Sequence, residues 1–260
     1  MQFRNRLQKL IFLPSGPDAT VSSAESRVAG FSGHLWRQML IKRDDRETEG
    51  ISHSSSVMIT VYLASTNPGK LREFRHAAEA RGIRVELLRG IEDLPVCVED
   101  GNTFEENARK KALHYSQWTD GLVFADDSGL SVNALDSRPG VLSARYAGPE
   151  ADDEANNRKL LRELAGVPPS RRAAHYACII ALAQRGNILT VVEGKAEGLI
   201  QDNPKGTGGF GYDPYFFYPP LNRTFAELSL EEKFEVSHRG KAFRKLLDYL
   251  ASEEVRHRLH

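Results

Sequence analysis

A run of polar and turn-forming residues, Ser65-Thr66-Asn67-Pro68-Gly69-Lys70, combines two hydroxyls, a carboxamide and a lysine. It follows the apolar run 58–64 and precedes a helical pattern over 70–81. Backbone N–H groups at a helix N-terminus attract anions, and the lysine adds a full positive charge. The segment therefore predicts a phosphate-binding loop, although it lacks the Lys-Ser/Thr pair of a Walker loop. An ordinary strand-to-helix turn, forced by Pro68-Gly69, is the alternative.

Two adjacent carboxylates, Asp126 and Asp127, follow a second apolar run at 122–125, and Ser128 comes next. We expect the strand to end at Ala125, so that the two carboxylates point in different directions at a strand-to-turn junction. One can then bind a metal ion while the other is braced by its neighbours. Mg²⁺ fits because it usually takes one or two carboxylates and shares the phosphates of its substrate. The alternative is an Asx-turn that closes the strand.

A charged segment adds three more candidates. Glu99 precedes a predicted helix over 103–118, while Asn107 and Lys111 are four residues apart and share one face of it. That face offers an amide and an ammonium group within reach of a phosphate. A solvated, charged helix is the alternative.

Glycines and aromatic rings interleave in the segment 206–214, which has four glycines within six positions. Such a backbone must turn sharply or approach a ligand closely. The rings of Phe210 and Tyr212, on either side of Gly211, suit a nucleobase because every base has a stacking surface. Asp213 can accept hydrogen bonds from a base edge. We favour ligand binding over a structural turn.

Three basic residues near the C-terminus complete the candidate set: Lys233, His238 and Arg239. The last two lie at the start of the final predicted helix, and as donors they can distinguish a ring carbonyl from a ring amine. A single histidine at a helix start is more often a surface residue or a cap.

Strand and helix patterns alternate after Met58, which predicts an α/β or α+β fold with a mixed sheet. Capping boxes begin helices at Thr103 and Ser229, and Asp152 or Asp153 caps another. Extended runs at 173–184 and 188–196 flank Arg185-Gly186-Asn187 and predict a hairpin. The other predicted elements are strands at 122–125 and 130–135 and a final helix from about Ser237, with Phe243, Leu246, Leu247 and Leu250 on one face.

Composition describes a globular protein, with 40% hydrophobic and 27% charged residues and a formal net charge of zero. Zero net charge gives no global field for nucleic acid, and no apolar run reaches the length of a membrane span. Cys97 and Cys178 lie in apolar contexts without CxxC spacing, which indicates buried thiols in a reducing compartment. We expect a cytoplasmic protein whose partners include neither nucleic acid nor a membrane.

The first 57 residues differ from the rest, with Ser-rich stretches and a charged run at 42–49. Their apolar pieces are too short for a core or a secretory signal, although a mitochondrial presequence is conceivable. We interpret 1–57 as a disordered or misassigned leader, 58–252 as the folded domain and 253–260 as a tail.

Taken in order, six segments resemble the Ham1/RdgB-type nucleoside triphosphate pyrophosphatases, the inosine triphosphatase family. The segments are Ser65 to Lys70, Thr103 to Ala108 with Lys111, Ala125 to Leu130, Pro139 to Tyr146, Gly208 to Pro214 and Ser237 to Gly240. Each is weak alone, but the ordered set is highly specific. The resemblance implies an elongated α/β fold, with a mixed sheet flanked by helices and two lobes around a central cleft. It also implies a homodimer.

The resemblance also assigns roles to the candidate residues. It implies that Asp127 is general base and Mg²⁺ ligand, that Glu99 and Asp126 complete the metal site, and that Lys111 acts with them on the phosphates. The substrate-binding set it implies is Ser65, Thr66, Asn67, Pro68, Gly69, Lys70, Ser128, Phe210, Gly211, Tyr212, Asp213, Lys233, His238 and Arg239.

The implied reaction is Mg²⁺-dependent hydrolysis of inosine, deoxyinosine and xanthosine triphosphates to the monophosphate and pyrophosphate. A 6-oxo purine accepts hydrogen bonds from His238 and Arg239, whereas the 6-amino group of adenine leaves these donors unpaired. Guanine also has a 6-oxo group, so its rejection must come from the 2-amino side. Two alternatives stay open: a Maf-like pyrophosphatase for modified nucleotides, and a nucleotide-sensing module without turnover.

Overall fold

The computed structural model describes residues 58–79, 81–150, 152–253 and 255. The interpretation of 1–57 as a leader lies outside these residues, as does most of the tail. The described part contains one seven-stranded sheet of order β2-β1-β3-β4-β5-β6-β7. Only β1 pairs in parallel, with β2 and with β3, and the remaining pairings are antiparallel. The strands are β1 (Ile59–Leu63), β2 (Ile83–Leu87), β3 (Leu122–Val132), β4 (Ala173–Gln184), β5 (Asn187–Ile200), β6 (Phe216–Tyr218) and β7 (Arg223–Thr224).

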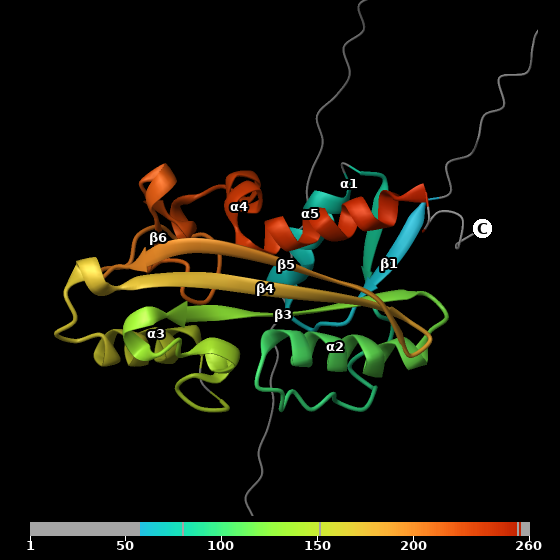
Figure 1. Ribbon diagram of the computed structural model, residues 1–260, viewed down its shortest axis with the longest axis horizontal. Helices are drawn as coiled ribbons and strands as arrows, with labels where there is room; N and C mark the ends of the chain where they lie inside the picture. The colour runs from blue at the N-terminus through green and yellow to red at the C-terminus, as the bar shows by residue number, and fades with distance from the viewer. Residues whose placement is uncertain (1–57, 80, 151, 254, 256–260) are drawn as a thin grey trace, which may run out of the picture. The chain divides into compact units, whose positions relative to one another are not determined.

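Helices cover both faces of this sheet, which confirms the predicted mixed sheet flanked by helices. Figure 1 shows α1, α4 and α5 on one face and α2 and α3 on the other. Phe124 of β3 packs with Phe74 and Phe243 beneath α1 and α5, whereas its neighbours Val123 and Ala125 pack against α2. The helices are α1 (Pro68–Glu79), α2 (Phe104–Tyr115), α3 (Asp153–Glu163), α4 (Leu230–Val236) and α5 (His238–Ala251).

Most local signals at the ends of elements are confirmed. Ser229 forms the predicted capping box at α4, and the side chain of Asp152 caps α3. Thr103 caps α2, but the predicted box is not closed there because Glu106 accepts from the N–H of Asn102 instead. The β4–β5 hairpin turns through Arg185 and Gly186, both with positive φ. None of the helices in the described ranges is long and apolar enough to cross a membrane. Both cysteines are buried free thiols, as predicted.

Three predicted boundaries are wrong. β3 does not end at Ala125 but continues as a single strand to Val132, because Asp126 to Gly129 pair with β4 from Ile180 to Ala177. Residues 133–135, expected to extend a strand, form a 3₁₀ turn. Helix α1 begins at Pro68 rather than after a Pro68-Gly69 turn, since the first helical position needs no N–H and suits the fixed φ of proline.

Candidate functional site

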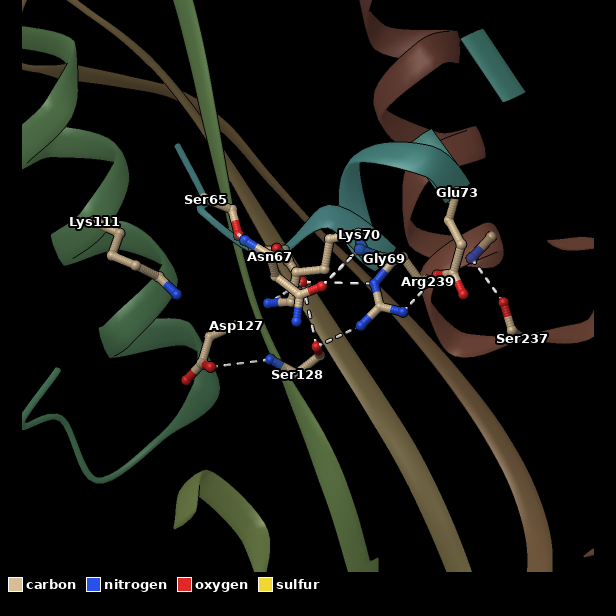
Figure 2. A network of polar contacts seen from close by, with 12 residues as sticks. Ser65, Asn67, Gly69, Lys70, Glu73, Lys111, Asp127, Ser128, Ser237 and Arg239 are labelled. Atoms are coloured by element: carbon tan, nitrogen blue, oxygen red, sulfur yellow. Dashed lines mark hydrogen bonds and ion pairs between the residues drawn. The ribbon is translucent and has the colours of Figure 1, made fainter. Parts of the chain in front are cut away.

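A pocket of about 480 Å³ lies next to the C-terminal end of β1. Strand β1 stops at Leu63, level with Phe124 of β3, and β3 continues past it. The loop that leaves β1, the β3 residues 127–129, α2, the β5–β6 loop and the start of α5 all contribute to the pocket wall. Figure 2 shows polar side chains from the loop after β1, from β3, from α2 and from the start of α5.

Most of the predicted site residues meet in this pocket. Those that line it are Ser65, Thr66, Asn67, Lys70, Glu99, Lys111, Asp127, Ser128, Phe210, Gly211, Tyr212, Asp213, Lys233, His238 and Arg239. Three others do not line it. Pro68 and Gly69 belong to the first turn of α1, and Asp126 is buried behind the wall.

The predicted phosphate loop differs from expectation in one respect. The Asn67 side-chain oxygen already accepts hydrogen bonds from the backbone N–H groups of Gly69 (2.9 Å) and Lys70 (3.2 Å). Pro68 has no N–H, and the N–H of Leu71 bonds to the carbonyl of Asn67. The expectation of free donors at this helix end is therefore wrong, and an anion here meets side chains such as those of Ser65 and Lys70.

Asp126 points to the α1 and α5 side of β3, where cations surround it. Its Oδ2 lies 2.9 Å from Lys70 Nζ and 3.7 Å from Arg239 Nε, and it accepts a hydrogen bond from Ser128 Oγ. Burial alone would raise the pKa of Asp126, but Lys70, Arg239 and the more distant Lys111 outweigh it and lower the pKa to about 2. This carboxylate is therefore ionised at neutral pH and held in place by its cationic partners.

Glu73 extends the same network and was missed by the sequence analysis. It is buried on α1, where its two oxygens bind Lys233 Nζ at 2.8 Å and Arg239 Nη1 at 2.5 Å. Lys233 also donates to Asp213 at 2.7 Å, and Arg239 to Ser128 Oγ at 3.0 Å. Burial raises the pKa of Glu73, but the two cations more than offset this and lower it. One carboxylate thus holds both Lys233 and Arg239.

Asp127 points the other way, toward α2. Its Oδ2 accepts a hydrogen bond from Asn107 Nδ2 (3.0 Å) and its Oδ1 from the N–H of Ser128 (3.0 Å). Nearby, Lys111 Nζ lies 3.0 Å from Glu99 Oε2. Burial raises the pKa of Asp127 above its ordinary value, against the opposing effects of Lys111 and Asn107. A carboxylate of this kind binds a proton more readily than an exposed aspartate.

Aromatic rings form the wall nearest α5. His238 stacks on Tyr176 with ring centroids 4.5 Å apart and an interplanar angle of 7°. Burial, together with the charges of Arg239 and Lys233, lowers the pKa of His238 well below its ordinary value. The imidazole is therefore neutral, with one nitrogen that donates and one that accepts.

The glycine-rich loop owes its conformation to close packing. Gly209 has a positive φ, and a Cβ there would lie 2.1 Å from Asp213 Oδ2. The same oxygen accepts a hydrogen bond from the N–H of Phe210, whose ring lies against Gly69 of α1. The Gly211 N–H donates to Asp153 on α3. The loop thus joins the two helix-bearing sides of the pocket.

Besides Glu73, which does not itself line the pocket, eight lining residues had no site role in the sequence analysis. They are Gly129, Val141, Ser143, Ala144, Arg145, Asp153, Asn156 and Tyr176. Glu73 carried a local signal, because it lies three residues after Lys70 on a predicted helix and therefore shares its face. Tyr176 lies mid-strand, and nothing local distinguishes it from a core residue.

The described residues hold no group of three or more His, Cys, Asp or Glu side chains arranged to bind a metal ion. Glu99 and Asp127 flank Lys111, whereas Asp126 faces the opposite side of β3. The three carboxylates predicted as ligands therefore do not converge on one point.

Fold and site together define an α/β protein with a pocket that is lined by both cationic and aromatic side chains. The chain belongs to the Ham1 family, whose model matches residues 61–249. It is 49% identical over 198 residues to a dITP/XTP pyrophosphatase of Geobacter sulfurreducens, covering 76% of this chain and all of that protein. A dITP/XTP pyrophosphatase of Desulforamulus reducens is 47% identical over 188 residues, covering 72% of this chain and 94% of that one.

A solved structure has the same fold. The HAM1 protein of Coxiella burnetii superposes with a TM-score of 0.67 at 40% identity, covering 74% of this chain and 98% of that chain. The family resemblance inferred from the motifs is therefore confirmed, and so is the mixed α/β fold.

Proposed function

We propose that this protein hydrolyses dITP, ITP and XTP to the monophosphate and pyrophosphate and so removes non-standard purines from the nucleotide pool. The observation that carries the proposal is the Asp127 carboxylate, which has a raised pKa and lies beside Lys111 and Glu99 in a pocket with an aromatic wall. The names of relatives that are 47–49% identical support it.

The reaction needs a water molecule directed at the α-phosphorus. As its oxygen bonds to phosphorus, the proton passes to Asp127, and the bond to the bridging oxygen breaks with its electron pair leaving on pyrophosphate. Asn107 holds the carboxylate in position through a 3.0 Å hydrogen bond. Lys111 and Lys70 stabilise the charge that develops on the phosphates.

The residues on the α2 side of the pocket fit a Mg²⁺ ion. Glu99 and Asp127 supply carboxylate oxygens, and the substrate's phosphates and water would complete the set, as is usual for this ion. Bound there, Mg²⁺ would withdraw charge from the leaving pyrophosphate. Asp126 fits this role less well because it faces Lys70 and Arg239 on the opposite side of β3 from Glu99 and Asp127. We assign it a supporting role instead.

Base selection is assigned to the aromatic wall. Phe210 and Tyr212 would pack on the purine, while the neutral His238 and the guanidinium of Arg239 donate to a 6-oxo group. Arg239 is held by Glu73 and Ser128, so its remaining N–H groups point in fixed directions. Fixed donors discriminate well, because a base that cannot accept leaves them unsatisfied.

We also expect the protein to be a cytoplasmic homodimer.

A panel of nucleoside triphosphates with Mg²⁺ tests the proposal, with products resolved as monophosphate and pyrophosphate. We expect turnover of dITP, ITP and XTP far above that of dATP and dGTP. Release of orthophosphate and a diphosphate would mean cleavage at the terminal phosphate and would contradict the proposal. Preference for a modified pyrimidine would favour the Maf-like alternative, and binding without turnover the sensing module.

A further inference from the structure

Arg145 lines the pocket but has no role in the function described so far. It is the last residue of a 3₁₀ helix (Gly140–Arg145), and its side chain is half-buried. Its Nη2 donates to the backbone carbonyl of Glu99 at 3.1 Å. The guanidinium therefore lies against the segment that carries a proposed metal ligand.

The charge of Arg145 is not neutralised, unlike that of the other pocket cations. Each of the other four has a carboxylate oxygen within 3.0 Å: Lys70 has Asp126, Lys111 has Glu99, Lys233 has Glu73 and Asp213, and Arg239 has Glu73. Among the described residues, Arg145 has no carboxylate at ion-pair distance, and its hydrogen bond goes to a neutral carbonyl. An incoming polyanion can therefore bind it without breaking an existing ion pair.

The backbone that carries Arg145 is held firmly by its neighbours. Tyr212 Oη donates to the carbonyl of Ser143 at 2.8 Å, and Asn156 Nδ2 to that of Ala144 at 3.2 Å. The Ser143 hydroxyl also accepts from the N–H of Leu130 in β3. A side chain mounted on fixed backbone loses less conformational entropy when it binds.

The contacts also connect Arg145 to the catalytic side of the pocket. Asp127 lies nearest the reacting phosphorus in the proposed mechanism, Lys111 is close to Asp127 and ion-paired with Glu99, and Arg145 donates to the backbone of Glu99. We propose that Arg145 binds the terminal phosphate of the substrate, which is the part of the triphosphate farthest from the base. This inference rests on the proposed function of the pocket. Guanidinium suits the role because its planar donors match phosphate oxygens in pairs.

Comparing dITP with dIDP, which lacks the terminal phosphate, tests this assignment. In Arg145→Gln we expect kcat/KM for dITP to fall about 10- to 100-fold, the range for a charge-assisted hydrogen bond, with dIDP changed by less than about 3-fold. Where dIDP turns over slowly, its inhibition constant against dITP gives the same comparison. Arg145→Lys keeps the charge without the planar donors and should fall in between.

A matched control is Arg158→Gln, on an exposed face of α3 and ion-paired with Glu154 outside the pocket, for which both substrates should behave as in the wild type. Equal losses for dITP and dIDP in Arg145→Gln would mean that Arg145 only supports the Glu99 segment and would overturn the inference. No loss for either would overturn it too.

Equilibrium binding without added Mg²⁺ separates this inference from the proposed function. The tighter binding of dITP relative to dIDP expected in the wild type should disappear in Arg145→Gln. If the wild type shows that difference without releasing pyrophosphate, the proposed function fails and the role of Arg145 stands. If the wild type turns over dITP but the variant keeps the difference, the inference fails and the function stands.

Discussion

The two sides of β3 treat adjacent carboxylates in opposite ways. On the α1 and α5 side, Asp126 belongs to a dense network of ion pairs that lowers its pKa to about 2. On the α2 side, Asp127 has one side-chain amide and one backbone N–H as partners, and burial raises its pKa. Neighbouring strand residues face opposite sides of a sheet, so one Asp-Asp pair can supply both a structural anion and a reactive base.

The largest expected effect comes from removing the base. Asp127→Asn should lower kcat for dITP by about 10²–10⁴ while leaving nucleotide binding within about tenfold, because general-base catalysis typically contributes that much. Steady-state kinetics and equilibrium binding measure the two quantities. Asp126→Asn is the comparison, and it should lose stability more than kcat. Wild-type activity in Asp127→Asn would remove Asp127 from the mechanism.

Asp127→Asn should lower kcat without lowering the stability of the fold at pH 7. A carboxyl whose folded pKa is raised favours the native state at low pH, and this contribution is lost as pH rises through the folded pKa. Asp127→Asn should therefore be at least as stable as the wild type at pH 7, with a smaller difference near pH 3. Thermal melts at the two pH values measure it.

Glu73→Gln tests the structural role of the ion-pair network on the α1 and α5 side of β3. It removes a buried carboxylate that holds Lys233 and Arg239, and breaking such a network costs about 3–5 kcal/mol in the free energy of unfolding. Chemical denaturation at pH 7 measures the loss. Because the folded pKa of Glu73 is lowered, its contribution is present above the ordinary pKa and disappears as pH falls.

A matched control for Glu73→Gln is Glu79→Gln, on an exposed position of the same helix, where a change within about 0.5 kcal/mol is expected. If both variants were equally stable, the ion-pair network around Asp126 and Glu73 would not contribute to the stability of the fold.

Arg239→Ala tests the selectivity for the base. If the guanidinium donates to the 6-oxo group, the variant should lose about 1–3 kcal/mol of transition-state binding for dITP, measured from kcat/KM, and much less for dATP. The ratio between the two substrates should therefore collapse. Arg239→Lys, which keeps a charge for Glu73, controls for lost stability. An unchanged ratio would mean that Arg239 serves phosphate or structure alone.

The smallest expected effect concerns the first 57 residues. A chain that begins at Met58 should fold and turn over dITP like the full chain, because the Ham1 match starts at residue 61. Moreover, 76% of this chain aligns with the whole Geobacter sulfurreducens relative. Melting temperature and kcat/KM of both chains provide the test. A large loss in the shortened chain would show that residues 1–57 support the domain.

Much of the architecture was readable from local signals, because caps and hairpin turns depend on neighbouring residues. Ser229 and Arg185-Gly186 behave as their sequence context predicts, and Thr103 caps its helix without closing the predicted box. The break expected after Ala125 was wrong because the Asp-Asp-Ser-Gly segment, a typical turn sequence, pairs with β4 instead. That pairing joins residues about fifty positions apart, and no local pattern reports it.

The candidate site was likewise only partly predictable from the sequence. The motifs named most of the lining residues, but the residue types alone did not distinguish the two carboxylates, and only the family resemblance assigned Asp127 as the base. The difference between the two carboxylates depends on Lys70 and on Arg239 of α5, a residue far along the chain that Glu73 holds in place. Charge compensation of this kind is a property of the folded core.

The hydrogen bonds from the Gly69 and Lys70 N–H groups to the Asn67 side chain bear on how this helix end binds small anions such as inorganic phosphate. Because this helix end is already occupied by a ligand from its own chain, inorganic phosphate gains little by settling there. A molecule that also reaches the rings of Phe210 and Tyr176 and the cations across the pocket gains from all of them together. Binding at this pocket is therefore expected to favour ligands that make several contacts at once over small inorganic anions.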